Sequence, residues 1–305
     1  MPEPVIFIAL EPHTDRDLHQ LDEALQILSR KEPTLHIYTN WYTDRVIIAC
    51  SEEMGDSYLT NLVAGVQHEF KIETTISKPQ SFYRETIRTG VRQEGRYIRQ
   101  SGGGHSYGHV VMEIEPGKPG SGLKFISKLV NAPVLEHYAE SIEQGVKETC
   151  ESGILAGYPV TDLIVTLVDG SYHEYDSHEM AFKIAASIAI AEAVKKAQPV
   201  LLEPVMKVTI EVFHDCLDEV IHLLDSLRCQ IDRQERSGEI AKIIARVPRA
   251  EMFGFQTDLD RLSQSCSSFS MEFDRFDEVP QCLTEKVVTE HEQRKLQARN
   301  SWKEL

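Results

Sequence analysis

A polar turn from Gly170 to Ser177 holds the residues of this chain that are best suited to chemistry. It contains Tyr172, His173 and Asp176, so an aromatic ring, an imidazole and a carboxylate occur together. A β-branched stretch precedes the turn, and a long Ala-rich stretch follows it. The sequence therefore predicts a strand, an exposed tip and a helix, in that order.

Enzymatic chemistry is the first interpretation of this turn. Ser171, His173 and Asp176 are the residue types of a hydrolytic relay, but residues that share one turn cannot easily form an ordered relay. A nucleotide-binding P-loop needs GxxxxGK[ST] after a strand. The glycine-rich run at 117–123 fails this spacing, and its prolines lack the N–H groups that bind phosphate. We therefore predict that this chain is not an enzyme and holds no cofactor of its own.

Metal binding is the second interpretation. His105, His109, His173 and His178 would come close if two tip loops adjoined. A zinc site would need three or four such ligands with supporting carboxylates. Exposed loop histidines are the simpler interpretation, so no metal site is predicted.

RNA binding is the third interpretation, and it involves a second loop. Arg99, Gln100 and Ser101 lead into three glycines at 102–104, and Tyr107 follows. Single-stranded and junction RNA is held by cations, by backbone in glycine-rich loops and by aromatic stacking. These two loops offer all three, although ordinary surface loops can have the same composition.

Composition limits the partners. The chain has 305 residues and a formal net charge of -16, which argues against a general nucleic-acid coat because phosphate binding needs cations. A local contact at a tip stays compatible with that charge. The six cysteines form no CxxC pair, and we find neither a membrane-length apolar run nor a signal peptide. We expect a cytoplasmic monomer with no membrane partner.

Hydrophobic periodicity predicts an α+β fold of three modules. Residues 1–80 and 201–279 each have the order βαββαβ, which predicts two ferredoxin-like sandwiches. Between them, residues 81–200 predict a mixed α/β unit with two strands, a helix over 136–150, a further strand and a long helix. Residues 280–305 form a polar tail, expected to be a loosely held helix or disorder.

Several motifs in one collinear order resemble the translation elongation factor G family, domains III, IV and V. They cover roughly residues 1 to 280 and are, in chain order, Pro2–Ile6, Lys78–Ile87, Ser101–Gly103 with Tyr107–Val110, Ala156–Val160, Gly170–Ser177, Leu201–Val208, Glu251–Phe255 and Ser270–Phe273. The middle module is then the domain IV-type unit, whose tip the family inserts into the ribosomal decoding site.

The resemblance implies a ribosome-associated factor that contributes to tRNA and mRNA translocation. Its partners would be the ribosome, through rRNA and the decoding site, and the tRNA–mRNA duplex. GTP would be used only through a domain that this chain lacks. The implied RNA- or ribosome-binding residues are Arg99, Gln100, Ser101, Gly102, Gly103, Tyr107, His109, Gly170, Ser171, Tyr172, His173, Asp176 and Arg228.

Departures from the family pattern leave an alternative open. The Glu52–Leu59 run of the first module lacks the family's histidine, and Leu227-Arg228-Cys229 replaces an Arg-Arg-Gly turn. The chain would then be a diverged paralogue without a GTPase, acting as a regulatory or protein-interaction module. Salt-sensitive co-sedimentation with ribosomes distinguishes the two hypotheses.

Overall fold

The computed structural model describes residues 4–12, 14–40, 45–51, 55–101, 104–129, 133–264 and 266–301. The chain forms two compact units. One comprises Met1–Tyr83 and Glu203–Asp277, and the other comprises Arg84–Leu202 and Glu278–Leu305. The chain therefore passes from one unit to the other after residues 83, 202 and 277.

The N-terminal part of the first unit is a ferredoxin-like sandwich. Its elements are β1 (Ile6–Pro12), α1 (Asp15–Lys31), β2 (His36–Asn40), β3 (Arg45–Cys50), α2 (Gly55–Phe70) and β4 (Thr74–Ile76). The strands have the order β2-β3-β1-β4, and β5 (Gln80–Ser81) adds to β1. Thr14 begins α1 by accepting a hydrogen bond from the Asp17 N–H at 3.1 Å, as an N-cap residue does. The apolar side of α1, with Leu21, Leu25 and Leu28, enters the core.

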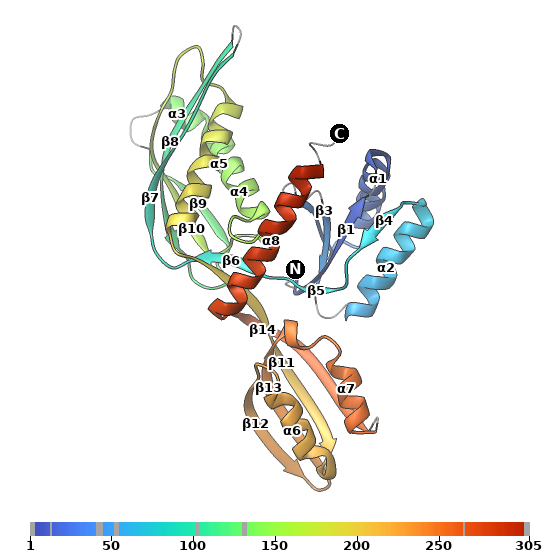
Figure 1. The fold of residues 1–305 in the computed structure, drawn as a ribbon. Helices are drawn as coiled ribbons and strands as arrows, with labels where there is room; N and C mark the ends of the chain where they lie inside the picture. Colours follow the sequence, from blue (N-terminus) through green and yellow to red (C-terminus); the bar gives the residue numbers. More distant parts are fainter. Residues whose placement is uncertain are drawn as a thin grey trace. The chain divides into compact units, whose positions relative to one another are not determined.

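The remaining part of this unit repeats the same topology. Its elements are β11 (Pro199–Phe213), η1 (His214–Cys216), α6 (Leu217–Asp225), β12 (Gln230–Ser237), β13 (Ile240–Pro248), η2 (Arg249–Glu251), α7 (Phe255–Leu262) and β14 (Ser267–Glu278). The order β12-β13-β11-β14 is the same permutation as in the first sandwich. Helices α6 and α7 cover one face of this sheet (Figure 1), where Leu217, Val220, Leu224 and Leu259 are buried.

The second unit is built on a mixed sheet with the order β7-β8-β10-β9. Its elements are β6 (Arg84–Ile87), β7 (Val91–Ser101), β8 (Gly104–Pro116), β9 (Leu123–Ser127), α3 (Pro133–His137), α4 (Ala139–Ser152), β10 (Leu163–Ser171) and α5 (Glu179–Lys196). Helix α5 lies against β7 and β8 at very short range. A Cβ atom on Gly95 would stand 2.1 Å from the Ala185 carbonyl oxygen, so only glycine permits this packing.

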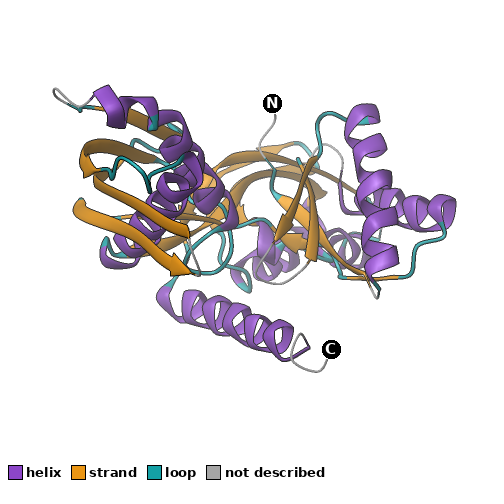
Figure 2. Ribbon diagram, turned by 90° about the horizontal axis from the view of Figure 1, so that it is seen from above, coloured by secondary structure: helices purple, strands orange, loops and turns teal. Residues whose placement is uncertain are grey.

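The structure confirms the predicted fold class and revises two details. Strand β9, which pairs in parallel with β10, was not expected from the sequence. The helix expected over 136–150 is divided into α3 and α4 near Tyr138. The polar tail forms one long helix, α8 (Gln281–Ser301), which leads to the C-terminal end in Figure 2. Residues 41–44, which connect β2 and β3, lie outside the described residues.

Candidate nucleic-acid interface

The pairing of β8 with β10 brings the two predicted loops together. Ser171 lies opposite His109 and Gly170 opposite Val110, so β10 ends at this position while β8 continues beyond it to Gly104. A bulge between Leu167 and Asp169 shifts the register before this point. At Gly170 a Cβ atom would lie 2.6 Å from the His109 carbonyl oxygen, which explains the glycine.

Side-chain hydrogen bonds then fasten the loops to each other. The Ser171 hydroxyl lies 2.7 Å from the Tyr107 hydroxyl and 2.8 Å from His109 Nδ1. The Tyr107 N–H donates to the Asp176 carbonyl oxygen at 2.8 Å, and the Ser177 hydroxyl donates to the Tyr107 carbonyl oxygen at 2.9 Å. Four of the predicted site residues therefore form one network that holds the tip in shape.

Three rings project from this support. Tyr172 is 49% exposed and Tyr175 is 85% exposed, while the His173 side chain is 57% exposed. His173 Nδ1 lies 3.0 Å from an Asp176 carboxylate oxygen, which orients the imidazole. The Tyr175 ring lies 6.5 Å from the His173 ring, centroid to centroid. Tyr175 is not among the residues predicted from the sequence, although an aromatic residue in the middle of a polar turn was the available signal.

The first loop is described in part. Arg99, Gln100 and Ser101 pair with Ser106, His105 and Gly104, so the β7–β8 hairpin is regular up to these residues. Gly102 and Gly103 lie outside the described residues. The Arg99 side chain is exposed.

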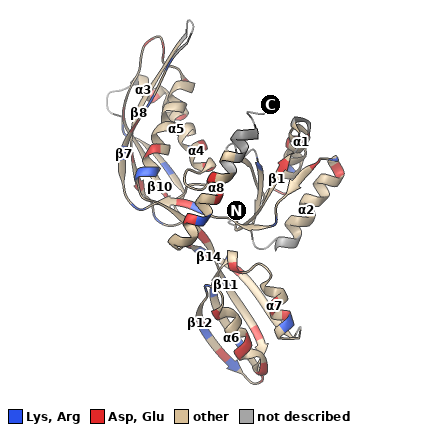
Figure 3. Ribbon diagram, viewed as in Figure 1, with Lys and Arg blue, Asp and Glu red and all other residues tan. Residues whose placement is uncertain are grey.

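Ion pairs engage the other arginines of β7. Arg92 lies 3.6 Å from Glu113, and Arg96 lies 3.1 Å from Glu94. Lys and Arg are interleaved with Asp and Glu over this unit in Figure 3. Arg99 is thus the cation of β7 that the described residues leave without a carboxylate partner.

Nucleophilic catalysis fits this arrangement poorly. Glu94 lies 3.5 Å from His109 Nε2, and His109 Nδ1 contacts the Ser171 hydroxyl, which gives a carboxylate, imidazole and hydroxyl in line. However, the Tyr107 hydroxyl shares the same Ser171 oxygen. The Gly170 N–H, which could have stabilised an oxyanion, donates to the Asp169 carboxylate at 2.8 Å. The geometry is that of a structural tie.

Three of the four histidines considered as metal ligands, His109, His173 and His178, have hydrogen-bond or ion-pair partners in the tip. His178 accepts from the Ala181 N–H at 3.3 Å and so caps α5, while its Nε2 lies 3.0 Å from the Ser106 hydroxyl. Over the described ranges, no group of three or more His, Cys, Asp or Glu residues is placed to hold a metal ion.

Arg228 lies in the other unit, and its guanidinium is engaged within the second sandwich. Two of its nitrogens pair with the carboxylate of Glu203, which is 3% exposed, one of them at 2.8 Å. Its Nε donates to Glu251 at 2.8 Å. The Glu203 hydrogen bonds, and then those of Glu251, raise the pKa of Arg228 against the opposing effect of burial. Because two carboxylates neutralise this cation, we leave it out of the interface proposed below.

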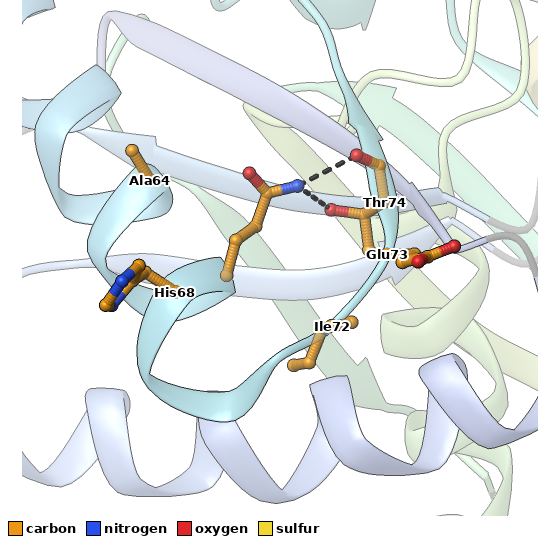
Figure 4. A pocket seen from close by; sticks show the side chains of 6 residues that line it. Ala64, His68, Ile72, Glu73 and Thr74 are labelled. Carbon is orange, nitrogen blue, oxygen red and sulfur yellow. Dashed lines mark hydrogen bonds between the residues drawn. The ribbon is translucent and has the colours of Figure 1, made fainter.

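A shallow depression of about 480 Å³ lies at the end of α2 (Figure 4). It is lined by Ala64, Gln67, His68, Ile72, Glu73 and Thr74. The Gln67 amide donates to the Thr74 carbonyl and hydroxyl oxygens at 2.8 and 2.6 Å. The depression is open and its amide is already satisfied, so it has no feature that selects a ligand.

Comparisons with known proteins identify the family of this chain. Three family models match in succession: "Elongation Factor G, domain III" at residues 1–78, "Elongation factor G, domain IV" at 79–198 and "Elongation factor G C-terminus" at 200–287. The chain belongs to the elongation factor G family. It is an elongation factor-like protein, and its residues correspond to domains III, IV and V of that family.

A solved structure has a similar fold. A crystal structure of a protein from Thermus thermophilus is similar to this chain, with 30% identity and a TM-score of 0.69. The match covers 96% of this chain and 43% of that one, so this chain spans less than half of that protein. Within the described residues, none of the helices has the length and apolar character needed to cross a membrane.

Proposed function

We propose that this chain is the ribosome-contacting part of a translation factor and contributes to tRNA and mRNA translocation through its tip loops. The observation that best supports this proposal is the hydrogen-bond network around Ser171, which joins two loops distant in sequence into one protruding surface. Membership of the elongation factor G family supports the choice of the ribosome as partner.

The division of roles at the tip follows from exposure. Tyr107, His109, Ser171 and Asp176 position the loops. Exposed aromatic rings stack on unpaired bases irrespective of sequence, and an exposed arginine neutralises phosphate. Tyr172, His173 and Tyr175 would therefore stack on bases, Arg99 would contact phosphate, and the glycines 102–103 would approach the RNA backbone. The chain would act by binding and shape, while any GTP hydrolysis would belong to another domain.

Ribosome co-sedimentation over a salt series tests this proposal. We expect the chain to bind ribosomes and to lose affinity as salt rises, because phosphate contacts release counterions. The double variant Tyr172→Ala, His173→Ala should bind at least about thirtyfold more weakly at fixed salt, because two stacking rings at about 1–3 kcal/mol each contribute about 2–6 kcal/mol. Phe213→Ala is the matched control, since that aromatic ring is similarly exposed at 45% but lies in the other unit.

Two results would contradict the proposal in different ways. Failure of the unaltered chain to co-sediment at physiological salt would favour the alternative, a protein-interaction module without ribosome contact. Equal binding by the double variant and the Phe213→Ala control would remove the tip rings from the interface. Far-UV circular dichroism should be unchanged in both variants, because the altered side chains are exposed.

A further inference from the structure

The unit that carries the tip (Arg84–Leu202 and Glu278–Leu305) also contains a buried carboxylate that binds the loop between α4 and β10. The carboxylate of Glu85 on β6 is fully buried and accepts four backbone N–H bonds from this one loop. The donors are Ile154, Leu155, Ala156 and Tyr158, at 2.7 to 3.1 Å. A carboxylate surrounded by successive N–H groups is the usual occupant of a backbone nest. Here the occupant belongs to the chain itself.

Backbone contacts reinforce this arrangement. The Glu85 N–H donates to the Pro159 carbonyl at 2.9 Å, and the Thr161 N–H donates to the Glu85 carbonyl at 2.8 Å. The Val160 N–H donates to the Cys150 carbonyl at 2.8 Å. The loop is therefore fixed between β6 and the end of α4. Burial raises the pKa of the Cys150 thiol to about 12, so this buried thiol is unreactive.

The loop in turn receives the C-terminal helix. Gly157 has φ of +77°, and a Cβ atom there would lie 2.3 Å from Cε1 of His291 on α8. His291 is 5% exposed, so its imidazole is seated directly on the glycine. Residues 284, 287 and 288 are half-buried and precede His291 at helical spacing, so one face of α8 is covered.

The start of α8 is held separately from His291. The Val279 N–H donates to the Leu201 carbonyl at 2.9 Å, and Glu278 pairs with Arg88 just before the helix. Contacts at residues 278 and 279 anchor the beginning of α8. His291 lies about three turns further along, well beyond these anchoring contacts.

We propose that residues Gly153–Pro159 form an intramolecular receptor loop for helix α8, and that Glu85 is the positioning residue that preforms it. Docking through His291 makes the C-terminal helix part of the tip-bearing unit. An undocked helix would leave the loop and the thiol beneath it exposed. This inference does not depend on ribosome binding.

Two glycine variants test the docking contact. Gly157→Ala adds a methyl group that would clash with the His291 ring. Gly120→Ala is the matched control, because Gly120 has nearly the same φ of +76° but no atom within 4 Å of the added Cβ. Both variants place alanine at nearly the same positive φ and so carry similar backbone strain. A difference in behaviour between them therefore reports the clash with His291.

Hydrogen exchange measured by mass spectrometry provides the main readout. We expect Gly157→Ala to speed exchange in the receptor loop and in the second half of α8 by more than about tenfold. Alkylation of Cys150 should speed up with it, while Cys50, buried in the other unit, serves as internal reference. Gly120→Ala should change neither readout. Equal behaviour of the two alanine variants would overturn the docking contact.

Two further variants test whether docking of α8 depends on His291 and on Glu85. His291→Ala should loosen α8, and adding Gly157→Ala to it should loosen α8 no further, because the ring that clashes is gone. Glu85→Gln turns an NH₂ group toward N–H donors and should undock α8 although Glu85 and His291 lie on separate elements. If Glu85→Gln loosens the loop while α8 keeps its full protection, Glu85 does not preform the receptor. Unchanged α8 protection in His291→Ala would refute the whole inference.

Discussion

Replacing Arg228 with alanine should destabilise the second sandwich strongly. The reason is the position of Glu203, whose side chain is 3% exposed and receives two hydrogen bonds from the Arg228 guanidinium. Without the arginine, this carboxylate stays buried with no cation to balance it. The variant therefore removes the cation that balances a buried carboxylate.

The expected magnitude follows from the unequal exposure of the two carboxylates. Removing one partner of a buried ion pair costs about 3–5 kcal/mol. Glu251 is 31% exposed, so Glu251→Gln should cost no more than about 1 kcal/mol, as for surface pairs. Arg228→Lys should fall between them, because an ammonium group cannot reproduce the two-pronged contact with Glu203.

Urea denaturation followed by far-UV circular dichroism measures these differences, and hydrogen exchange in β12 and α7 locates them. We expect the order Arg228→Ala, Arg228→Lys, Glu251→Gln from most to least destabilised. A loss below about 1 kcal/mol for Arg228→Ala would refute the reasoning, since a buried unpaired carboxylate cannot cost so little. The same variant should bind ribosomes with unchanged salt dependence once folded, whereas a reduced salt slope would return Arg228 to the interface.

Two other predictions concern packing and pH. Gly95→Ala should lower the free energy of unfolding by about 1–3 kcal/mol or more, because its Cβ would stand 2.1 Å from the Ala185 carbonyl oxygen. Gly90→Ala, where the nearest atom is 3.5 Å away, should be nearly neutral in the same thermal or urea measurement, and equal losses would contradict the packing argument. Burial raises the pKa of Glu85 although four N–H groups favour its carboxylate, so the folded state holds this proton more tightly than the unfolded chain. The unaltered protein should thus have its largest stability advantage over Glu85→Gln below about pH 4, near the pKa of the unfolded chain. This advantage should shrink as the pH rises through the folded pKa. An advantage that grows with pH would show that the N–H groups outweigh burial.

Much of the secondary structure follows from local pattern. The apolar spacing in α1 and α6 and the alternation in β13 reflect burial of one face, which leaves a period of 3.6 or 2 in the sequence. The repeated βαββαβ order predicted the two sandwiches for this reason. Strand β9 escaped prediction because it has five residues and gains its strand partner, β10, only after the α3–α4 crossover.

The residues of the tip were recognisable from type and order, but their roles were decided by tertiary contacts. The sequence by itself showed that Tyr107, His109 and Ser171 belong near a tip. Pairing between β8 and β10 turned them into internal ties, and it left Tyr172 and Tyr175 outward. Exposure depends on which strands meet, and no local pattern contains that information.

The role of Arg228 was likewise decided by tertiary contacts and not by the sequence. The sequence counts Arg228 as one cation in a chain of net charge -16, and its family position suggested a ribosome contact. Folding places it against Glu203, 25 residues earlier, and neutralises it. The fate of a charge is set by its distance to other charges and to water, and both are properties of the folded chain.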